Sequence, residues 1–177
     1  MAFFTVFHAS QVDGIAEYTP PPVNEIEAHE TAEKIISASG AEIIYGGARA
    51  FYQPSTDSIH MPPKEDFINA TGYYSILLHE LTHWTGHSSR LKRDLSGRKY
   101  TTSYAREELV AEIGSMFISC VAKIPQSEEV FHASYVEGWL ECIRNDCNAI
   151  FKAAADANRA ADFILIKAGI QERSCEA

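Results

Sequence analysis

Hydrophobic and polar positions alternate with a strand-like period in the first part of the chain and with a helical period in the second. Residues 3–10, FFTVFHAS, are rich in aromatic and β-branched side chains and predict a strand. Shorter runs of the same kind follow at 42–45, 50–53 and 58–61. Gly46-Gly47 and Pro54-Ser55-Thr56-Asp57 lie between these runs and are typical turn residues. Because strands joined by short turns usually pair in sequence order, the pattern predicts a small, mostly antiparallel meander.

Apolar residues at helical spacing predict the remaining elements. The first helix is expected between the strand at 3–10 and the other strands, with Asn24 as its N-cap and Gly40 at its end. Gly86 is a natural residue to end the next helix. The later helices are expected at 71–84, 104–123, 128–145 and 147–168. A small sheet followed by a helical half is typical of an α+β domain, and we expect residues 1–177 to form a single one.

Length and composition agree with this expectation. The 177 residues suffice for one sizeable hydrophobic core, and the contents of 46% hydrophobic and 22% charged residues are ordinary. No apolar run approaches the roughly 18 residues that cross a bilayer, and the first residues lack the basic start of a secretory signal. We therefore expect no membrane partner. The four cysteines contain no CxxC pair and are expected to be reduced, as in a cytoplasmic protein: Cys120, Cys142, Cys147 and Cys175.

The net charge of −9 argues against a protein that grips nucleic acid over its whole surface, because such proteins present a basic face. One segment departs from the acidic balance, and it contains Arg90, Lys92, Arg93, Arg98 and Lys99. It has two interpretations, a solvated loop or a contact surface for an acidic partner.

The run His79-Glu80-Leu81-Thr82-His83 has the spacing of a metal-binding helix. Residues four apart on an α-helix share one face, so His79 and His83 direct two imidazoles at one point. Glu80 lies one step round the helix, where it reaches a water molecule at the metal rather than the coordination point. The neighbouring residues are apolar and predict a buried helix, in which these polar groups would be costly without partners. The motif predicts zinc ligands at His79 and His83 and a general base at Glu80, with histidines hydrogen-bonded inside the core as the alternative.

A catalytic zinc usually has three protein ligands and one open position. A third histidine six residues after His83 would be typical of the metzincins, but position 89 is Ser. His87 follows the expected helix end at Gly86 and is interpreted as a loop or helix-end residue rather than a ligand.

A downstream helical segment offers carboxylates for the third position. Glu108, Ala111 and Glu112 match a Glu-x-x-Ala pattern, followed by an acidic residue, that several HExxH families with a glutamate ligand share. We expect Glu108 to bind the zinc and Glu112, one turn along, to hydrogen-bond a ligand imidazole. Both lie on one helical face, so the two roles are exchangeable. Glu107 is expected to be an exposed helix charge.

Two longer segments resemble the C-terminal zincin domain of ArdC-type antirestriction proteins, which also occurs in TraC-type plasmid primases. They are YYSILLHELTHWTGHSSRLKRD, from Tyr73, and YAREELVAEIGSMF, from Tyr104. Segments 6–15, 50–67 and 139–165 extend the resemblance over most of the chain. The resemblance implies a zincin-like metallopeptidase fold and a cytoplasmic protein linked to mobile elements. In such proteins the domain usually follows one that binds single-stranded DNA; we expect that domain to be absent here, and DNA to be a partner only through it.

These residues favour zinc-dependent hydrolysis of a protein or peptide substrate. Ser58–Met61 is the expected edge strand for pairing with an extended substrate. Tyr104 is the candidate hydrogen-bond donor to the tetrahedral oxyanion, with Tyr73, Tyr74 and Tyr100 as competitors. Two other hypotheses remain. One is an acidic antirestriction module that mimics DNA and uses the metal structurally, and the other is a regulatory peptidase that cleaves a single partner. The oligomeric state is open.

Overall fold

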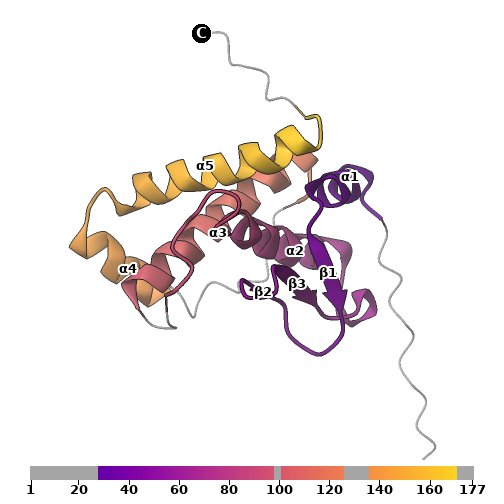
Figure 1. Ribbon diagram of the computed structural model, residues 1–177, viewed down its shortest axis with the longest axis horizontal. Helices are drawn as coiled ribbons and strands as arrows, with labels where there is room; N and C mark the ends of the chain where they lie inside the picture. The colour runs from indigo at the N-terminus through magenta and orange to yellow at the C-terminus, as the bar shows by residue number, and fades with distance from the viewer. Residues whose placement is uncertain (1–27, 98–100, 126–135, 171–177) are drawn as a thin grey trace, which may run out of the picture.

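The computed structural model describes residues 28–97, 101–125 and 136–170. In chain order its elements are α1 (Glu30–Ser39), β1 (Glu42–Tyr45), β2 (Phe51–Gln53), β3 (Ser58–Met61), the 3-10 turn η2 (Lys64–Asp66), α2 (Ala70–Thr85), α3 (Thr102–Ala122), α4 (Val136–Asn145) and α5 (Ala149–Lys167). The small sheet and α1 lie at one end of the molecule and α4 at the other, with α2 and α3 between them (Figure 1). The α+β architecture and the four later helices agree with the sequence pattern. The strand predicted at 3–10 lies outside the described residues.

The sheet is not the meander that the sequence predicts. Its strand order is β1-β3-β2, with β1 parallel and β2 antiparallel to β3. The β2–β3 hairpin forms as expected, but β1 pairs with the third strand and not with the second. β3 is the most buried of the three, because it receives hydrogen bonds on both sides and packs its side chains into the core. Ser58–Met61 is therefore the central strand of the described sheet, and its prediction as an edge strand is wrong.

Helix α1 begins later than its sequence predicts. His29 is its N-cap and accepts a hydrogen bond from the backbone N–H of Ala32, whereas the expected N-cap, Asn24, lies outside the described residues. Gly40 ends the helix with a φ of 71°, a left-handed conformation that glycine adopts without steric cost.

Helix α2 is buried on most of its circumference, which explains its almost continuous apolar sequence. Its N-cap Asn69 accepts a hydrogen bond from the Gly72 N–H at 2.8 Å, and the helix ends at Gly86 as predicted. Leu77, Leu78 and Leu81 are fully buried in the main core, which also takes in α1, β3 and α5. A helix enclosed in this way holds its polar side chains rigidly, because few rotamers fit the surrounding packing.

Helix α3 crosses close to α2 and supplies the other wall of the site. Thr101 caps its first turn, and Lys123 ends it in a left-handed conformation with φ 61°. The close approach depends on Gly114, because a Cβ atom at this position would lie 2.6 Å from Cγ2 of Thr82 on α2. α5 packs along α3 and closes the core from the other side (Figure 1). Within the described residues no helix has the length and apolar character that crossing a membrane requires.

Candidate metal centre

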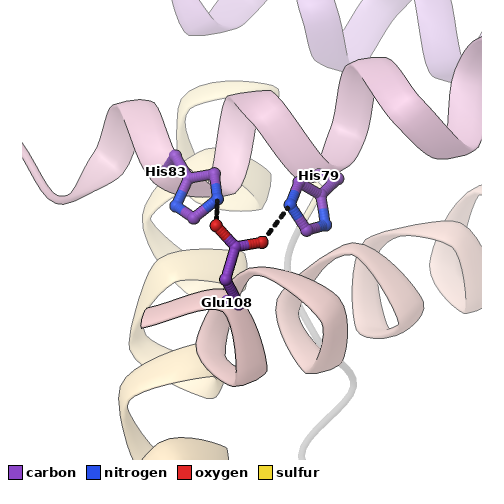
Figure 2. A group of neighbouring side chains, drawn as sticks. All are labelled: His79, His83 and Glu108. Atoms are coloured by element: carbon purple, nitrogen blue, oxygen red, sulfur yellow. Dashed lines mark ion pairs between the residues drawn. The ribbon is translucent and has the colours of Figure 1, made fainter. Parts of the chain in front are cut away.

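Three side chains from α2 and α3 converge on one point. Figure 2 shows the carboxylate of Glu108 between the imidazoles of His79 and His83, with one oxygen directed at each ring. Glu108 Oε2 lies 3.5 Å from His79 Nε2, and Glu108 Oε1 lies 3.7 Å from His83 Nε2. One donor atom from each residue lies within 4.8 Å of the other two. The structure thus brings together the three residues that the sequence predicts as metal ligands.

The spacing of these atoms fits a shared divalent ion. Metal bonds of about 2.0–2.2 Å at tetrahedral angles place the ligand atoms about 3.4 Å apart. The separations of 3.5 and 3.7 Å, each to a different oxygen of Glu108, are close to this value, and the set with one donor atom from each residue lies within 4.8 Å. The donor set of two imidazole nitrogens and one carboxylate oxygen is one that zinc accepts. These three side chains therefore form a candidate metal-binding site.

The second nitrogen of each imidazole faces another carboxylate. His79 Nδ1 lies 3.3 Å from Glu112, and His83 Nδ1 lies 3.1 Å from Glu107. A proton held at Nδ1 would leave the Nε2 lone pair of each ring free for a metal ion, which is the tautomer that metal binding requires. Glu112 thus lies beside the imidazole of His79, and its role as a hydrogen-bond partner of a metal ligand stays a prediction.

The prediction for Glu107 as an exposed helix charge is wrong. Glu107 is only 9% exposed, and its carboxylate contacts His83 and the guanidinium of Arg93. Helical periodicity could not reveal this position, because Glu107 lies about 100° round the helix from Glu108. The side of α3 on which Glu107 lies is enclosed by α2 and by the segment after it, and both contacts come from distant positions in the chain.

Two arginines of the basic segment after α2, Arg90 and Arg93, are not solvated as a surface loop would have them. Arg93 donates to Glu107 at 2.9 Å, to the Thr85 hydroxyl at 2.8 Å and to the Thr82 carbonyl at 2.7 Å. The side chains of Arg90 and Arg93 are only 10% and 9% exposed. Lys92 is exposed, and the remaining basic residues, Arg98 and Lys99, lie outside the described residues.

His87 stands apart from the metal site. It follows the end of α2, and its Nδ1 lies 2.8 Å from the hydroxyl of Ser89, the position where the metzincin pattern would have a histidine. The interpretation of His87 as a helix-end residue agrees with this placement. His87 does not line the cleft beside the metal centre.

Electrostatics in the centre favour charged groups despite their burial. Burial opposes the charged form of His79, but hydrogen bonds to Glu108 and Glu112 and the charge of Glu80 raise its pKa to about 10. Burial likewise acts against ionised Glu108 and Glu107, yet their hydrogen bonds to His79 and His83 and the positive charges nearby lower both pKa values. In the metal-free protein the raised pKa favours the imidazolium form of His79, whose Nε2 proton a metal ion must displace.

Glu80 and Tyr104 both border a cleft of about 290 Å³ beside the metal ligands. Glu80 is 9% exposed, and its Oε2 accepts a hydrogen bond from the backbone N–H of Tyr52 on β2 at 2.8 Å. The Tyr104 side chain hydrogen-bonds Glu108 and contributes to the lowered pKa of that carboxyl. The sequence did not reveal that Tyr52 contacts Glu80, because the donor is a backbone amide, which almost every residue type has.

Of the three competing tyrosines, Tyr73 and Tyr74 do not line this cleft. Tyr73 and Tyr74 are each 1% exposed in the core, where the hydroxyl of Tyr73 bonds that of Tyr45 and the hydroxyl of Tyr74 donates to Glu33. Tyr100 lies outside the described residues.

The chain is similar to known proteins over most of its length. The profile of the zincin-like metallopeptidase family matches residues 30–156. A DNA primase TraC of Escherichia coli is 48% identical over 168 residues, which are 92% of this chain but 15% of the primase. Protein y4eC of Sinorhizobium fredii is 42% identical over 91% of this chain and 52% of its own length. This chain thus spans a small part of the primase and about half of y4eC.

Solved structures show the same relationship. The Mn(II)-bound crystal structure of the antirestriction protein ArdC from plasmid R388 is 40% identical, with a TM-score of 0.73 over 93% of this chain and 62% of ArdC. The metal-free ArdC structure gives a TM-score of 0.71. The family match, these relatives and the HExxH helix at the centre of the fold agree, and the chain belongs to the zincin-like metallopeptidase family.

Proposed function

We propose that this domain hydrolyses peptide bonds with a zinc ion held by His79, His83 and Glu108. The observation that carries the proposal is the convergence of these three side chains beside a cleft. The same cleft is lined by Glu80, a buried carboxylate that is not one of the candidate ligands. A purely structural metal site has no need of such a carboxylate. The Mn(II) ion in the related ArdC structure supports binding of a divalent ion by this fold.

Each residue around the candidate metal site has a definite role in this proposal. When bound, the metal ion would polarise the scissile carbonyl and make a water molecule more acidic. Glu80 takes the proton from the attacking water and returns it to the leaving amine. Tyr104 lies beside Glu108 and donates a hydrogen bond to the oxygen that gains negative charge. Glu112 and Glu107 hold the two imidazoles in the tautomer that binds the ion.

The strand that pairs with the substrate is β2 in this proposal. β2 is at the edge of the described sheet, and Phe51, Tyr52 and Pro54 line the cleft. In its antiparallel pairing with β3, the Tyr52 N–H is directed away from β3 and toward Glu80. That amide is taken by Glu80, and the Tyr52 carbonyl, which points to the same side of the strand, is the main-chain group that this edge offers to an extended peptide in the cleft.

Replacement of Glu80 tests the proposal. Glu80→Gln keeps the shape of the side chain but removes the base, so the variant should bind zinc as tightly as the wild type and cleave β-casein roughly 10²- to 10⁴-fold more slowly. Glu65→Gln, an exposed position on η2, is the matched control and should leave the rate unchanged. Turnover retained by Glu80→Gln would reject the proposed base.

The alternative is a non-catalytic acidic module with a structural metal. It is favoured by the net charge of −9 and by the antirestriction name of the related ArdC. The same assay separates the two functions. A wild-type protein that holds zinc at full occupancy, cleaves no unfolded substrate and inhibits a restriction nuclease without metal would establish the binding module instead.

A further inference from the structure

Arg90 joins the end of α2 to the β2–β3 hairpin. Its Nε donates to the Trp84 carbonyl at 2.7 Å, and its guanidinium lies 3.7 Å from the centre of the Trp84 ring. The two terminal nitrogens reach the two carboxylate oxygens of Asp57 in the hairpin turn. A stacked, bidentate arginine is held in one geometry, because the planar group meets its partners in several fixed directions at once.

Asp57 and Tyr52 complete this contact on the hairpin. The Tyr52 hydroxyl donates to Asp57 Oδ1 at 2.8 Å, and Arg90 lies 3.4 Å from the same hydroxyl. Asp57 has a φ of 54°, a left-handed conformation that aspartate tolerates better than most residues. The hydrogen bonds from Arg90 lower the pKa of Asp57, so this carboxylate is ionised at neutral pH. We refer to Arg90, Asp57 and Tyr52 together as the hairpin clamp.

The hairpin clamp contacts the proposed general base, Glu80, through the backbone of Tyr52. The side chain of Tyr52 is held by Asp57 and Arg90, while its backbone N–H donates to Glu80 at 2.8 Å. Among the described residues, this amide is the one hydrogen-bond partner of the Glu80 carboxylate. The position of β2 over α2 therefore decides where the carboxylate of Glu80 lies in the cleft.

We propose that the hairpin clamp is a positioning device, in which Arg90 and Asp57 fix Tyr52 so that its main-chain amide orients Glu80 toward the reacting water. The inference rests on the proposed peptidase function for its kinetic consequence, but the orientation itself is a property of the folded chain. None of the three side chains is among the candidate metal ligands, so the device acts on the base and not on the ion.

Amide exchange tests the orientation without any catalysis. In the metal-free full chain, Asp57→Asn and Tyr52→Phe should speed hydrogen exchange of the residue-52 amide by roughly 5- to 30-fold, the effect of losing about one hydrogen bond. Asparagine also tolerates the left-handed conformation at position 57, so the turn itself is kept. Lys92→Gln, an exposed change in the segment that carries Arg90, is the control and should leave the exchange unchanged. Unchanged exchange in both clamp variants would overturn the inference.

Kinetics test the consequence for the base. Arg90→Gln and Asp57→Asn should lower kcat on β-casein roughly 10- to 100-fold while the zinc Kd stays unchanged. In a Glu80→Gln background the same substitutions should have no further effect, because the group that they position has lost its function. A full additional loss in that background would show general structural damage and refute the positioning role. A wild type without any cleavage would reject the proposed function, while the amide exchange would still decide the orientation.

Discussion

Replacement of Gly114 by alanine tests whether the close approach of α3 to α2 sets the metal site. The new Cβ would lie 2.6 Å from Thr82 Cγ2 and 3.2 Å from its Oγ1, whereas carbon atoms in contact are ordinarily about 3.5–4.0 Å apart. Thr82 cannot easily turn away, because it is fully buried and its hydroxyl donates to the Leu78 carbonyl at 2.8 Å. The two helices must therefore separate by about 1 Å or distort locally.

The magnitude follows from two opposing terms. Overpacking of a buried contact costs about 1–3 kcal/mol, and so severe a contact lies at the upper end. Alanine is favoured over glycine inside a helix by about 1 kcal/mol. The net loss in the free energy of unfolding should be about 2 kcal/mol, which corresponds to a fall in Tm of about 4–8 °C for a domain of this size.

The site should respond as well. Metal ligands must stay within about 0.2 Å of their ideal distances, so a separation of α2 from α3 should weaken zinc binding measurably. Thermal unfolding monitored by circular dichroism gives the stability, and competition with a chromogenic chelator gives the zinc Kd.

A second substitution makes this reasoning falsifiable. Thr82→Ser removes the methyl group that the new Cβ atom at position 114 would strike and keeps the hydroxyl, so on this background Gly114→Ala should be neutral or stabilising and should restore zinc affinity. An equal loss of stability with and without the Thr82 methyl would refute the steric explanation. A wild-type-like Gly114→Ala protein would show that the helices are not held at this distance.

Two further predictions concern charge in the metal centre. The pKa of His79 is raised from its usual value of 6.5 to about 10. The contribution of His79 to the free energy of unfolding is therefore complete below about pH 6.5 and is lost as pH rises toward 10, which urea titrations in EDTA should show. Zinc affinity should rise by up to about tenfold per pH unit in the same range. A metal-free domain whose stability rises across that range would contradict the raised pKa. Arg93→Met leaves Glu107 buried without its cation and should cost about 3 kcal/mol of unfolding free energy, measured by urea denaturation. Arg93→Met combined with Glu107→Met should recover part of that loss, and a cost below about 1 kcal/mol for the single change would show that the pair is not effectively buried.

The sequence was sufficient where the information is local. Histidines four residues apart on a helix share a face wherever that helix lies, so the placement of His79 and His83 followed from their spacing alone. The Glu108–Glu112 register could be recognised for the same reason. The helix end at Gly86 was also predicted, but Gly86 keeps a right-handed conformation with φ −73°, and a Cβ atom there would lie 2.9 Å from Cδ2 of Leu95, a contact that the sequence could not reveal.

Tertiary structure decided every relation between distant segments. The exchange of neighbours in the sheet, which places β3 in the centre, depends on which strand is most deeply packed and not on the order of turns. The sequence pattern indicates exposed charges at Glu107 and Arg93. Only the crossing of α3 over α2 buries them as a pair beside His83. The hydrogen bond to Glu80 comes from a backbone amide on β2, which any residue except proline can supply. Local periodicity thus determined which side chains share the face that lines the candidate metal site, whereas packing between segments determined what holds them there.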